Sequence, residues 1–311
     1  MSKPILLSAL HHIRVEVADL ASNTAFARDF GLTEVERQGD TVYWRAGGAD
    51  AYSYVAQAGA GTRLSAVAFC AESRAQLERA IREYGATPIR RLKGPGGGEA
   101  VSLTDPNGNT IDIVFGIEGR QPDPVRPDAR VNSPGNRQRL NVAHRYPDGP
   151  GHPLRLGHFV LFVADFQKVE QWYCRILNIV PSDRIYAAPG VFIGGFYRLD
   201  RGAEWVDHHV IGFFGMGQLG LHHMSFEVQD IEQQMVSHRF LQGRNHQSVW
   251  GVGRHPLGSH VFDMWKDPNG LRFETYSDTD WCNNERPPAD HPVQGADMDM
   301  WSNDDAARYF T

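Results

Sequence analysis

The chain has few cysteines, no long apolar run and no excess of positive charge. Only three cysteines occur among 311 residues, and no two of them form a Cys-x-x-Cys pair. This argues against a disulfide framework and fits a reducing cytoplasm, where we expect the protein to reside. No apolar stretch approaches the length that crosses a bilayer, and residues 1–8 lack the pattern of a signal peptide. With a net charge of −6 and no basic run, the chain is not expected to bind nucleic acid or a membrane.

What the chain does contain is an internal repeat. Three segments of its first part align with three of its second part: residues 10–20 with 156–166, 64–69 with 221–226, and 105–112 with 267–274. The alignment pairs His12 with His158, Ala66 with His223, and Asp112 with Glu274. Only the second repeat therefore has two histidines and a carboxylate at these positions, a set whose open positions suit non-haem Fe(II) and oxygen chemistry. We expect the first repeat to be a scaffold.

The order of the expected elements is the same in both repeats. Each reads as a strand, a helix and several strands, with Leu20 to Phe30 as the first helix, ended by Gly31. The two Asp-Pro-Asn-Gly segments are predicted to be structural turns between strands. The sequence predicts an α+β fold of two tandem domains, each of paired βαβββ modules that form a curved mixed sheet. The expected divisions are an N-terminal scaffold domain without a complete metal site (1–117), a linker (118–152), a C-terminal catalytic domain (153–281) and a polar tail (282–311).

The second repeat also carries a motif known from one enzyme family. Gly253 and His255 form a Gly-x-His, and after a spacer Asp267 opens an Asp-Pro-x-Gly turn that is followed four residues later by Glu274. In these motifs the chain resembles type I extradiol ring-cleavage dioxygenases of the vicinal oxygen chelate superfamily. The resemblance extends over nearly the whole chain as a two-domain enzyme and is densest from residue 156 to residue 280.

The chain departs from the family pattern at two positions. Asp263 stands where an apolar residue is usual, and Met264 stands where the family has a tyrosine in its site. The hydrogen bond proposed for that tyrosine has no counterpart on this strand, which suggests a divergent branch similar to trihydroxytoluene oxygenases. Strand alternation places Phe262 and Met264 on one face and Asp263 on the other. We expect these two residues, together with His260 and Tyr276, to line the substrate pocket.

The resemblance assigns roles to five residues of the second repeat. It implies that His158, His223 and Glu274 are the metal ligands, and strand alternation agrees that only one histidine of the pair at 222–223 points inward. His209 falls at the position of the family's acid–base histidine, which suits taking a proton from a substrate hydroxyl and returning one. His255 falls where a histidine helps to position substrate or oxygen.

The resemblance implies extradiol cleavage of a catechol-like or trihydroxylated aromatic by O2. The expected cofactor is Fe(II), with Mn(II) less favoured, and the expected partners are a small aromatic with vicinal hydroxyls and further copies of the chain in a homo-oligomer. Two alternatives remain open at this point. One is a metal-dependent lyase or isomerase of glyoxalase type, whose ligands are generally drawn from both repeats. The other is a non-catalytic small-molecule-binding protein of the same fold.

Overall fold

The computed structural model describes residues 3–128, 130–293, 298–302 and 304–310. Parts of the expected linker (129) and of the expected tail (294–297, 303 and 311) therefore lie outside the described residues, as do residues 1–2. The helices are α1 (Leu20–Phe30), α2 (Arg74–Tyr84), α3 (Phe166–Ile176), α4 (Ile231–Gly243) and the short 3-10 helix η2 (Ala306–Phe310).

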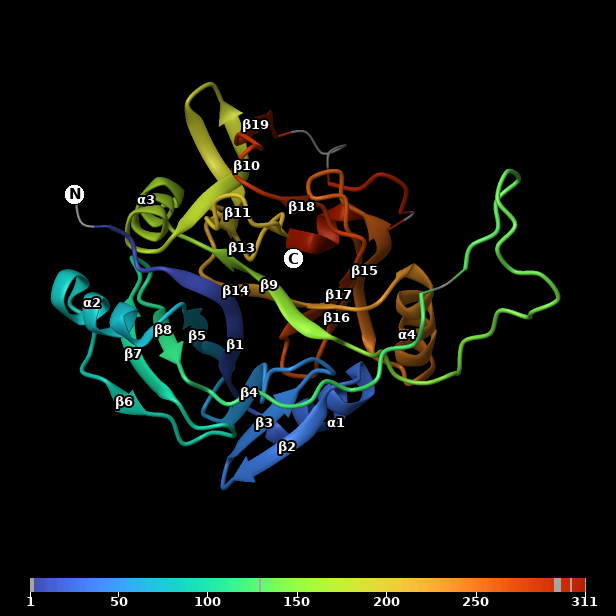
Figure 1. The fold of residues 1–311 in the computed structure, drawn as a ribbon, viewed down its shortest axis with the longest axis horizontal. Helices are drawn as coiled ribbons and strands as arrows, with labels where there is room; N and C mark the ends of the chain where they lie inside the picture. Colours follow the sequence, from blue (N-terminus) through green and yellow to red (C-terminus); the bar gives the residue numbers. More distant parts are fainter. Residues whose placement is uncertain (1–2, 129, 294–297, 303, 311) are drawn as a thin grey trace.

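Most strands belong to two mixed sheets (Figure 1). The first has the order β2-β3-β4-β1-β5-β8-β7-β6, and the second has the order β15-β16-β17-β14-β9-β13-β11-β10-β19. The strands of the first sheet are β1 (Leu7–Val17), β2 (Thr33–Gln38), β3 (Thr41–Arg45), β4 (Tyr54–Ala58), β5 (Arg63–Ala71), β6 (Arg90–Arg91), β7 (Glu99–Thr104) and β8 (Thr110–Phe115). Those of the second are β9 (Arg155–Phe162), β10 (Ile179–Ala188), β11 (Val191–Leu199), β13 (Ile211–Phe214), β14 (Gly220–Glu227), β15 (Gln247–Arg254), β16 (Val261–Lys266), β17 (Arg272–Ser277) and β19 (Ala289–Pro292). A separate two-stranded sheet pairs β12 (Val206–Asp207) with β18 (Trp281–Cys282).

This architecture confirms the predicted fold class of paired modules with curved mixed sheets. The first helix shows how the local sequence determines it. The Asp19 side chain accepts hydrogen bonds from the backbone N–H groups of Ala21 and Ser22, and so caps the helix at the predicted start. Gly31 ends it in the left-handed conformation, with φ of 107°. The glycine-containing run just before His255 is the end of strand β15.

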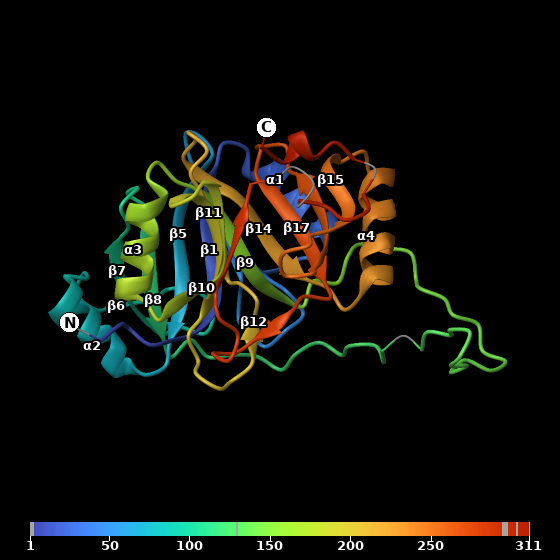
Figure 2. The ribbon, with the colours of Figure 1, turned by 90° about the horizontal axis from the view of Figure 1, so that it is seen from above.

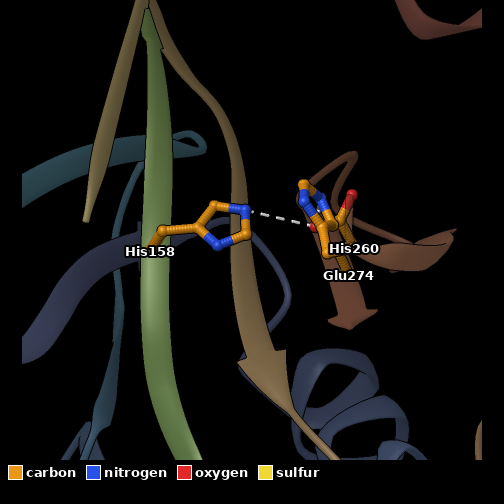
Figure 3. Close-up of side chains that lie close together, drawn as sticks. All are labelled: His158, His260 and Glu274. Carbon is orange, nitrogen blue, oxygen red and sulfur yellow. Dashed lines mark ion pairs between the residues drawn. The ribbon is translucent and has the colours of Figure 1, made fainter. Parts of the chain in front are cut away.

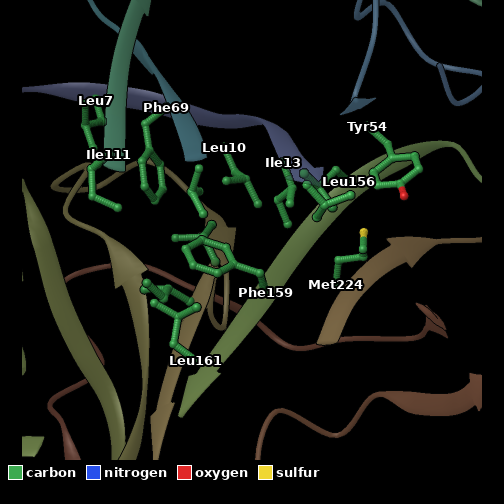
Figure 4. Close-up of a cluster of buried hydrophobic side chains, with 14 of the residues drawn as sticks. Leu7, Leu10, Ile13, Tyr54, Phe69, Ile111, Leu156, Phe159, Leu161 and Met224 are labelled. Atoms are coloured by element: carbon green, nitrogen blue, oxygen red, sulfur yellow. The ribbon is translucent and has the colours of Figure 1, made fainter. Parts of the chain in front are cut away.

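The largest hydrophobic core lies between the two sheets and is built from both repeats. Figure 4 shows Leu7, Leu10 and Phe69 of the first sheet against Phe159 and Leu161 of the second, and all of them are buried. The rings of Phe69 and Phe159 are 6.0 Å apart. Because side chains alternate along a strand, β9 directs Phe159 and Leu161 into this core, and the intervening side chains face the opposite side of the sheet.

The two Asp-Pro-Asn-Gly turns join the repeats to each other. Asp105, in the turn between β7 and β8, accepts a 3.1 Å hydrogen bond from the hydroxyl of Tyr173 on α3. In the second repeat Asp267, between β16 and β17, accepts a 2.8 Å hydrogen bond from the amide of Asn23 on α1. The asparagines of the two turns also bond across the repeats. The side-chain oxygen of Asn107 accepts a hydrogen bond from the backbone N–H of Ala164, and that of Asn269 accepts one from the backbone N–H of Asp19. Each turn thus contacts the start or the body of a helix in the other repeat.

The segment between β8 and β9 has no named helix or strand among its described residues. Figures 1 and 2 show it leaving the body of the molecule as a long loop and returning past α4. Its return is fixed at the start of α4, where Asp230 accepts a 2.9 Å hydrogen bond from Tyr146 and pairs with Arg126. Within the described part of the chain, none of the helices is sufficiently long and apolar to cross a membrane.

Candidate metal centre

Three neighbouring strands of the second sheet bring the predicted ligands together. Strand β14 pairs with β9 on one side and with β17 on the other, which places Ser225 between His158 and Glu274, with His223 two residues away on β14. Nε2 of His158 lies 3.2 Å from Oε1 of Glu274, and Nε2 of His223 lies 3.9 Å from the same oxygen. Ser225, also on β14, donates a 2.6 Å hydrogen bond to Oε1 and so orients the carboxylate.

A further histidine lies at the same carboxylate. Nε2 of His260 is 4.0 Å from Oε1 of Glu274, and ligand atoms of His158, His260 and Glu274 all lie within 4.8 Å of one another (Figure 3). We had expected His260 in the substrate pocket and not among the ligands. Its position just before β16 gives it the same parity as residues 262 and 264, and this was the available signal that it faces the site. The assignment of His223 as the third ligand stays a prediction.

The donor set fits a divalent cation. Glu274 is fully buried, and its Oε2 has no hydrogen-bond partner among the described residues, nor has Nδ1 of His260. A buried carboxylate oxygen without a partner is costly, and a coordinated cation would remove that cost. Burial, followed by the neighbouring histidines, holds the pKa of His223 and His260 well below the usual value, so both imidazoles are neutral, as metal ligands must be. His158, His223 and Glu274, with His260 beside them, are the residues that would hold the ion.

Nε2 of His223 faces the carboxylate, 3.9 Å from Oε1 of Glu274. The neighbouring ring of His222 packs behind it, with the two Nδ1 atoms 2.7 Å apart, so one of these nitrogens donates a hydrogen bond to the other. Nε2 of His222 lies against the main-chain carbonyl of Tyr309 and 2.5 Å from Nη1 of Arg272. Burial, and then the charge of Arg272, lowers the pKa of His222 to about 3, so this ring is neutral. These contacts hold the ring of His223 in place.

The same arrangement occurs at His209. Nε2 of His208 donates a 2.5 Å hydrogen bond to Asp183, a buried carboxyl whose pKa lies below its usual range because of its bonds with His208 and His291. When His208 is neutral, its Nδ1 accepts the 3.1 Å hydrogen bond from Nδ1 of His209. Nε2 of His209 then carries a lone pair, and among the described residues this buried atom has no partner. That is the form a general base requires.

His255 is held by a carbonyl of the C-terminal segment. Its Nδ1 donates a 2.5 Å hydrogen bond to the carbonyl of Met298, which leaves the lone pair on Nε2. Its ring stacks on Phe262, with centroids 4.0 Å apart and planes 16° from parallel. His255 is thus fixed in orientation at the end of β15, consistent with the predicted role in positioning.

The site opens into a cavity of about 180 Å³. Besides the histidines at 158, 209, 223, 255 and 260 and the carboxylate, its walls are mainly apolar, and the described residues include Val160, Ile185, Ile193, Phe196, Phe214, Met216 and Leu257. The last part of the chain forms another wall, through His291, Pro292, Val293, Met298 and Tyr309. This wall could not be predicted from the sequence, because the tail lacks any periodic pattern.

Three predicted pocket residues lie behind the cavity surface, which differs from our expectation. Phe262 is covered by the ring of His255, and Met264 is buried in a cluster with Trp250 and Tyr309. Tyr276 is buried against His158, with ring centroids 5.1 Å apart. The histidines at 158 and 255, which pack against Tyr276 and Phe262, line the cavity instead.

Asp263, which lies between Phe262 and Met264 on β16, faces the opposite side of the sheet, as predicted. Asp263 accepts hydrogen bonds from the indole N–H of Trp265, at 2.7 Å, and from Nδ1 of His238 on α4, at 3.0 Å. The carboxyl group is fully buried. Asp263 therefore contributes to packing between β16 and α4 and does not reach the cavity.

The first repeat uses the equivalent positions differently. Asp112, the counterpart of Glu274, bonds to Arg90 at 2.6 Å and to the hydroxyl of Ser102 at 2.5 Å. His12 is buried, and Ala66 supplies no ligand atom. Among the described residues, only His158, His260 and Glu274 form a group of three side chains with metal-ligand spacing.

Comparison with known proteins agrees with this geometry. Residues 155–275, which include β9, β14 and the first part of β17, match the Glyoxalase/Bleomycin resistance protein/Dioxygenase superfamily. "Metapyrocatechase 2" of Cupriavidus necator is 27% identical over 88% of this chain and 82% of its own length. "Manganese-dependent 2,3-dihydroxybiphenyl 1,2-dioxygenase" of Geobacillus genomosp. 3 is 25% identical over 87% of each chain.

Solved structures share the fold over the full chain. Homoprotocatechuate 2,3-dioxygenase from Brevibacterium fuscum superposes with a TM-score of 0.82 over 100% of this chain and 93% of that one, at 18% identity. A Mn(II)-bound glyoxalase from Novosphingobium aromaticivorans reaches 0.78 over 95% and 90%, at 20% identity. Residues 155–275 thus match the glyoxalase and dioxygenase superfamily that the motifs resemble, and two relatives align with most of the chain. Within that superfamily its curated relatives are extradiol ring-cleavage dioxygenases, which confirms the predicted enzyme class.

Proposed function

We propose that the protein uses a divalent metal, Fe(II) in preference to Mn(II), to open the ring of a monocyclic catechol or trihydroxybenzene with O2, next to the vicinal hydroxyls. His158, His223 and Glu274 are the proposed ligands. The observation that carries the proposal is the convergence of imidazoles on one buried carboxylate oxygen at the end of a largely apolar cavity. A bound Fe(II) would supply a centre that chelates both substrate hydroxyls and passes electrons from the ring to oxygen.

The residues of the chain would perform the proton chemistry. We propose that Nε2 of His209 accepts a proton from one substrate hydroxyl and later returns it to the product, because its lone pair is already directed away from His208. His255 would hold the substrate or oxygen through its own Nε2, since its Nδ1 is engaged by Met298. The apolar walls would exclude water from the reacting ring.

The cavity lining narrows the substrate class. No lysine or arginine occurs among the described residues that line it, so a substrate carboxylate would be buried there without a cationic partner, at considerable cost. Its volume of about 180 Å³ suits one aromatic ring, since an apolar cavity of roughly 150 Å³ takes up benzene. We therefore propose a substrate with small uncharged substituents, such as an alkylcatechol or a trihydroxytoluene.

A glyoxalase-type reaction is the less favoured alternative. Such sites generally draw ligands from both repeats, and here Ala66 and the Arg90–Asp112 pair occupy the corresponding positions of the first repeat. A non-catalytic binding protein would not need a buried carboxylate oxygen left without a partner among the described residues, as Oε2 of Glu274 is.

The test is oxygen uptake by protein loaded anaerobically with Fe(II) or with Mn(II). We expect 3-methylcatechol and a trihydroxytoluene to give a yellow ring-opened product with matched oxygen consumption, and His223→Ala to abolish it. Cleavage of 3,4-dihydroxyphenylacetate should have a kcat/KM at least about tenfold lower, because its carboxylate would lose hydration in the cavity. No uptake with any catechol would contradict the dioxygenase proposal. A preference for the carboxylate substrate would contradict the argument from the cavity lining.

A further inference from the structure

The C-terminal segment places one phenol in the substrate cavity. Tyr309, on η2, is 2% exposed and contributes the only hydroxyl-bearing side chain among the described lining residues. Figures 1 and 2 show η2 beside β15, far in sequence from the strands that carry the metal centre. The ring of Tyr309 lies 5.3 Å from that of Trp250 and 6.0 Å from that of His223.

The main chain at this point is fixed by the site itself. The carbonyl of Tyr309 accepts a 2.6 Å hydrogen bond from Nη1 of Arg272 on β17, and Nε2 of His222 also lies against this carbonyl. The preceding Arg308 donates a 2.8 Å hydrogen bond to the carbonyl of Ser248 on β15. Because His222 and Arg272 are both buried, these contacts anchor η2 at the site.

Tyr309 also occupies the space next to the altered strand position. It packs in one cluster with Met264 and Phe262, and Met264 is fully buried and supplies no polar group. The strand therefore offers no hydrogen-bond donor toward the cavity at this position, and the tail brings a phenol to the same cluster. Burial, and then the charge of Glu274, raises the pKa of Tyr309 above its usual range, so the hydroxyl keeps its proton and remains a donor.

We propose that Tyr309 is the substrate-facing phenol of this site, donating a hydrogen bond to an oxygen of the bound substrate in place of a donor on β16. The inference rests on the proposed function, because it takes the cavity to be the place where a catechol binds. A catecholate oxygen carries negative charge, and a hydrogen bond donated to a charged acceptor is among the stronger ones in proteins. The tail is then part of the binding site and not a separate appendage.

The experiment compares Tyr309→Phe with Tyr84→Phe in full-length, metal-loaded protein. Tyr84 is the matched control, since its hydroxyl bonds to the carbonyl of Lys3 in the first repeat, remote from the cavity. The first readout is anaerobic titration with 4-nitrocatechol, whose absorption band reports both binding and the ionisation of its hydroxyls. We expect Tyr309→Phe to bind it about tenfold more weakly, with a shifted band, and Tyr84→Phe to match the wild type. The ring is retained in Tyr309→Phe, and thermal unfolding should confirm an intact fold.

The two proposals can fail separately. An unchanged dissociation constant and an unchanged band in Tyr309→Phe would overturn the assignment of its hydroxyl, whether or not the wild type opens catechols. If the wild type opens no catechol but Tyr309→Phe still weakens 4-nitrocatechol binding and shifts its band, the proposed reaction is wrong and the role of Tyr309 in binding stands.

Discussion

The pairing of His208 with His209 leads to a prediction about the acid–base nitrogen. In His208→Phe the ring is kept, but the acceptor for Nδ1 of His209 is lost. Asp183 retains its hydrogen bonds from Arg286, at 3.1 Å, and from His291, at 3.0 Å, so we expect the fold to survive. His209 is then free to carry its proton on either ring nitrogen.

The size of the effect follows from the hydrogen bond that is removed. Both rings are buried and the contact is 3.1 Å long, so the bond is of ordinary strength in a dry site. Loss of such a partner costs roughly 1–3 kcal/mol. If that free energy selects the form of His209 with its lone pair on Nε2, kcat/KM for an alkylcatechol should fall by about 5- to 150-fold.

Two measurements check this prediction. Nitrogen-15 spectra of the metal-free protein show which ring nitrogen of His209 is protonated, and oxygen uptake by the loaded enzyme gives kcat/KM. The control is His11→Phe, because His11 makes the equivalent 2.7 Å contact with His12 in the first repeat, where no ligand set is formed. The reasoning is refuted if His208→Phe leaves both the nitrogen-15 spectrum and kcat/KM unchanged, or if His11→Phe has the same effect.

Three further predictions concern stability. Burial lowers the pKa of the cavity histidines below the value of 6.5 that a histidine has in the unfolded chain, so below pH 6.5 the unfolded state binds more protons than the folded state. In urea unfolding of the metal-free protein, stability should therefore fall below pH 6.5 by about 1.4 kcal/mol per pH unit for each histidine. A flat stability profile from pH 7.5 to 5.5 would contradict this. In Gly157→Ala the new Cβ would lie 2.5 Å from Cε1 and Cζ of Tyr276. We expect urea unfolding to show a loss of roughly 1–3 kcal/mol of stability, and we expect a lower metal content. Wild-type values in both measurements would refute the packing argument. Asn23→Ala removes the buried hydrogen bond to Asp267 and a hydrogen bond with Tyr54. The free energy of unfolding in urea should fall by about 2–3 kcal/mol, whereas a change below roughly 0.5 kcal/mol would show that the turn contact contributes little.

Much of the metal centre could be predicted from sequence because its residues lie on regular strands of a repeat. The alignment placed His158, His223 and Glu274 at equivalent strand positions, and strand pairing then brings such positions together. His209 and His255 came from the family resemblance, and the structure places both at the cavity.

The parts that were missed depend on contacts between segments far apart in the chain. Tyr309 reaches the cavity from a tail without periodicity, so no local pattern could indicate it. His260 faces Glu274 although it lies in a loop just before its strand. Met264 packs in one cluster with Tyr309, and of these two side chains only Tyr309 lines the cavity. The direction of a side chain follows from strand geometry, whereas its access to the cavity depends on what packs against it from distant segments.

The two Asp-Pro-Asn-Gly turns make each half of the chain depend on the other for its structure. Asp105 of the half without a complete ligand set bonds to α3 of the other half, and Asp267 bonds back to α1. In the first half Ala66 supplies no ligand atom, yet the turn at Asp105 still holds α3 of the second half. Deleting the first half would expose Tyr173 and the inner face of β9 to water. We therefore expect a fragment that contains only the second half to be less stable than the full chain.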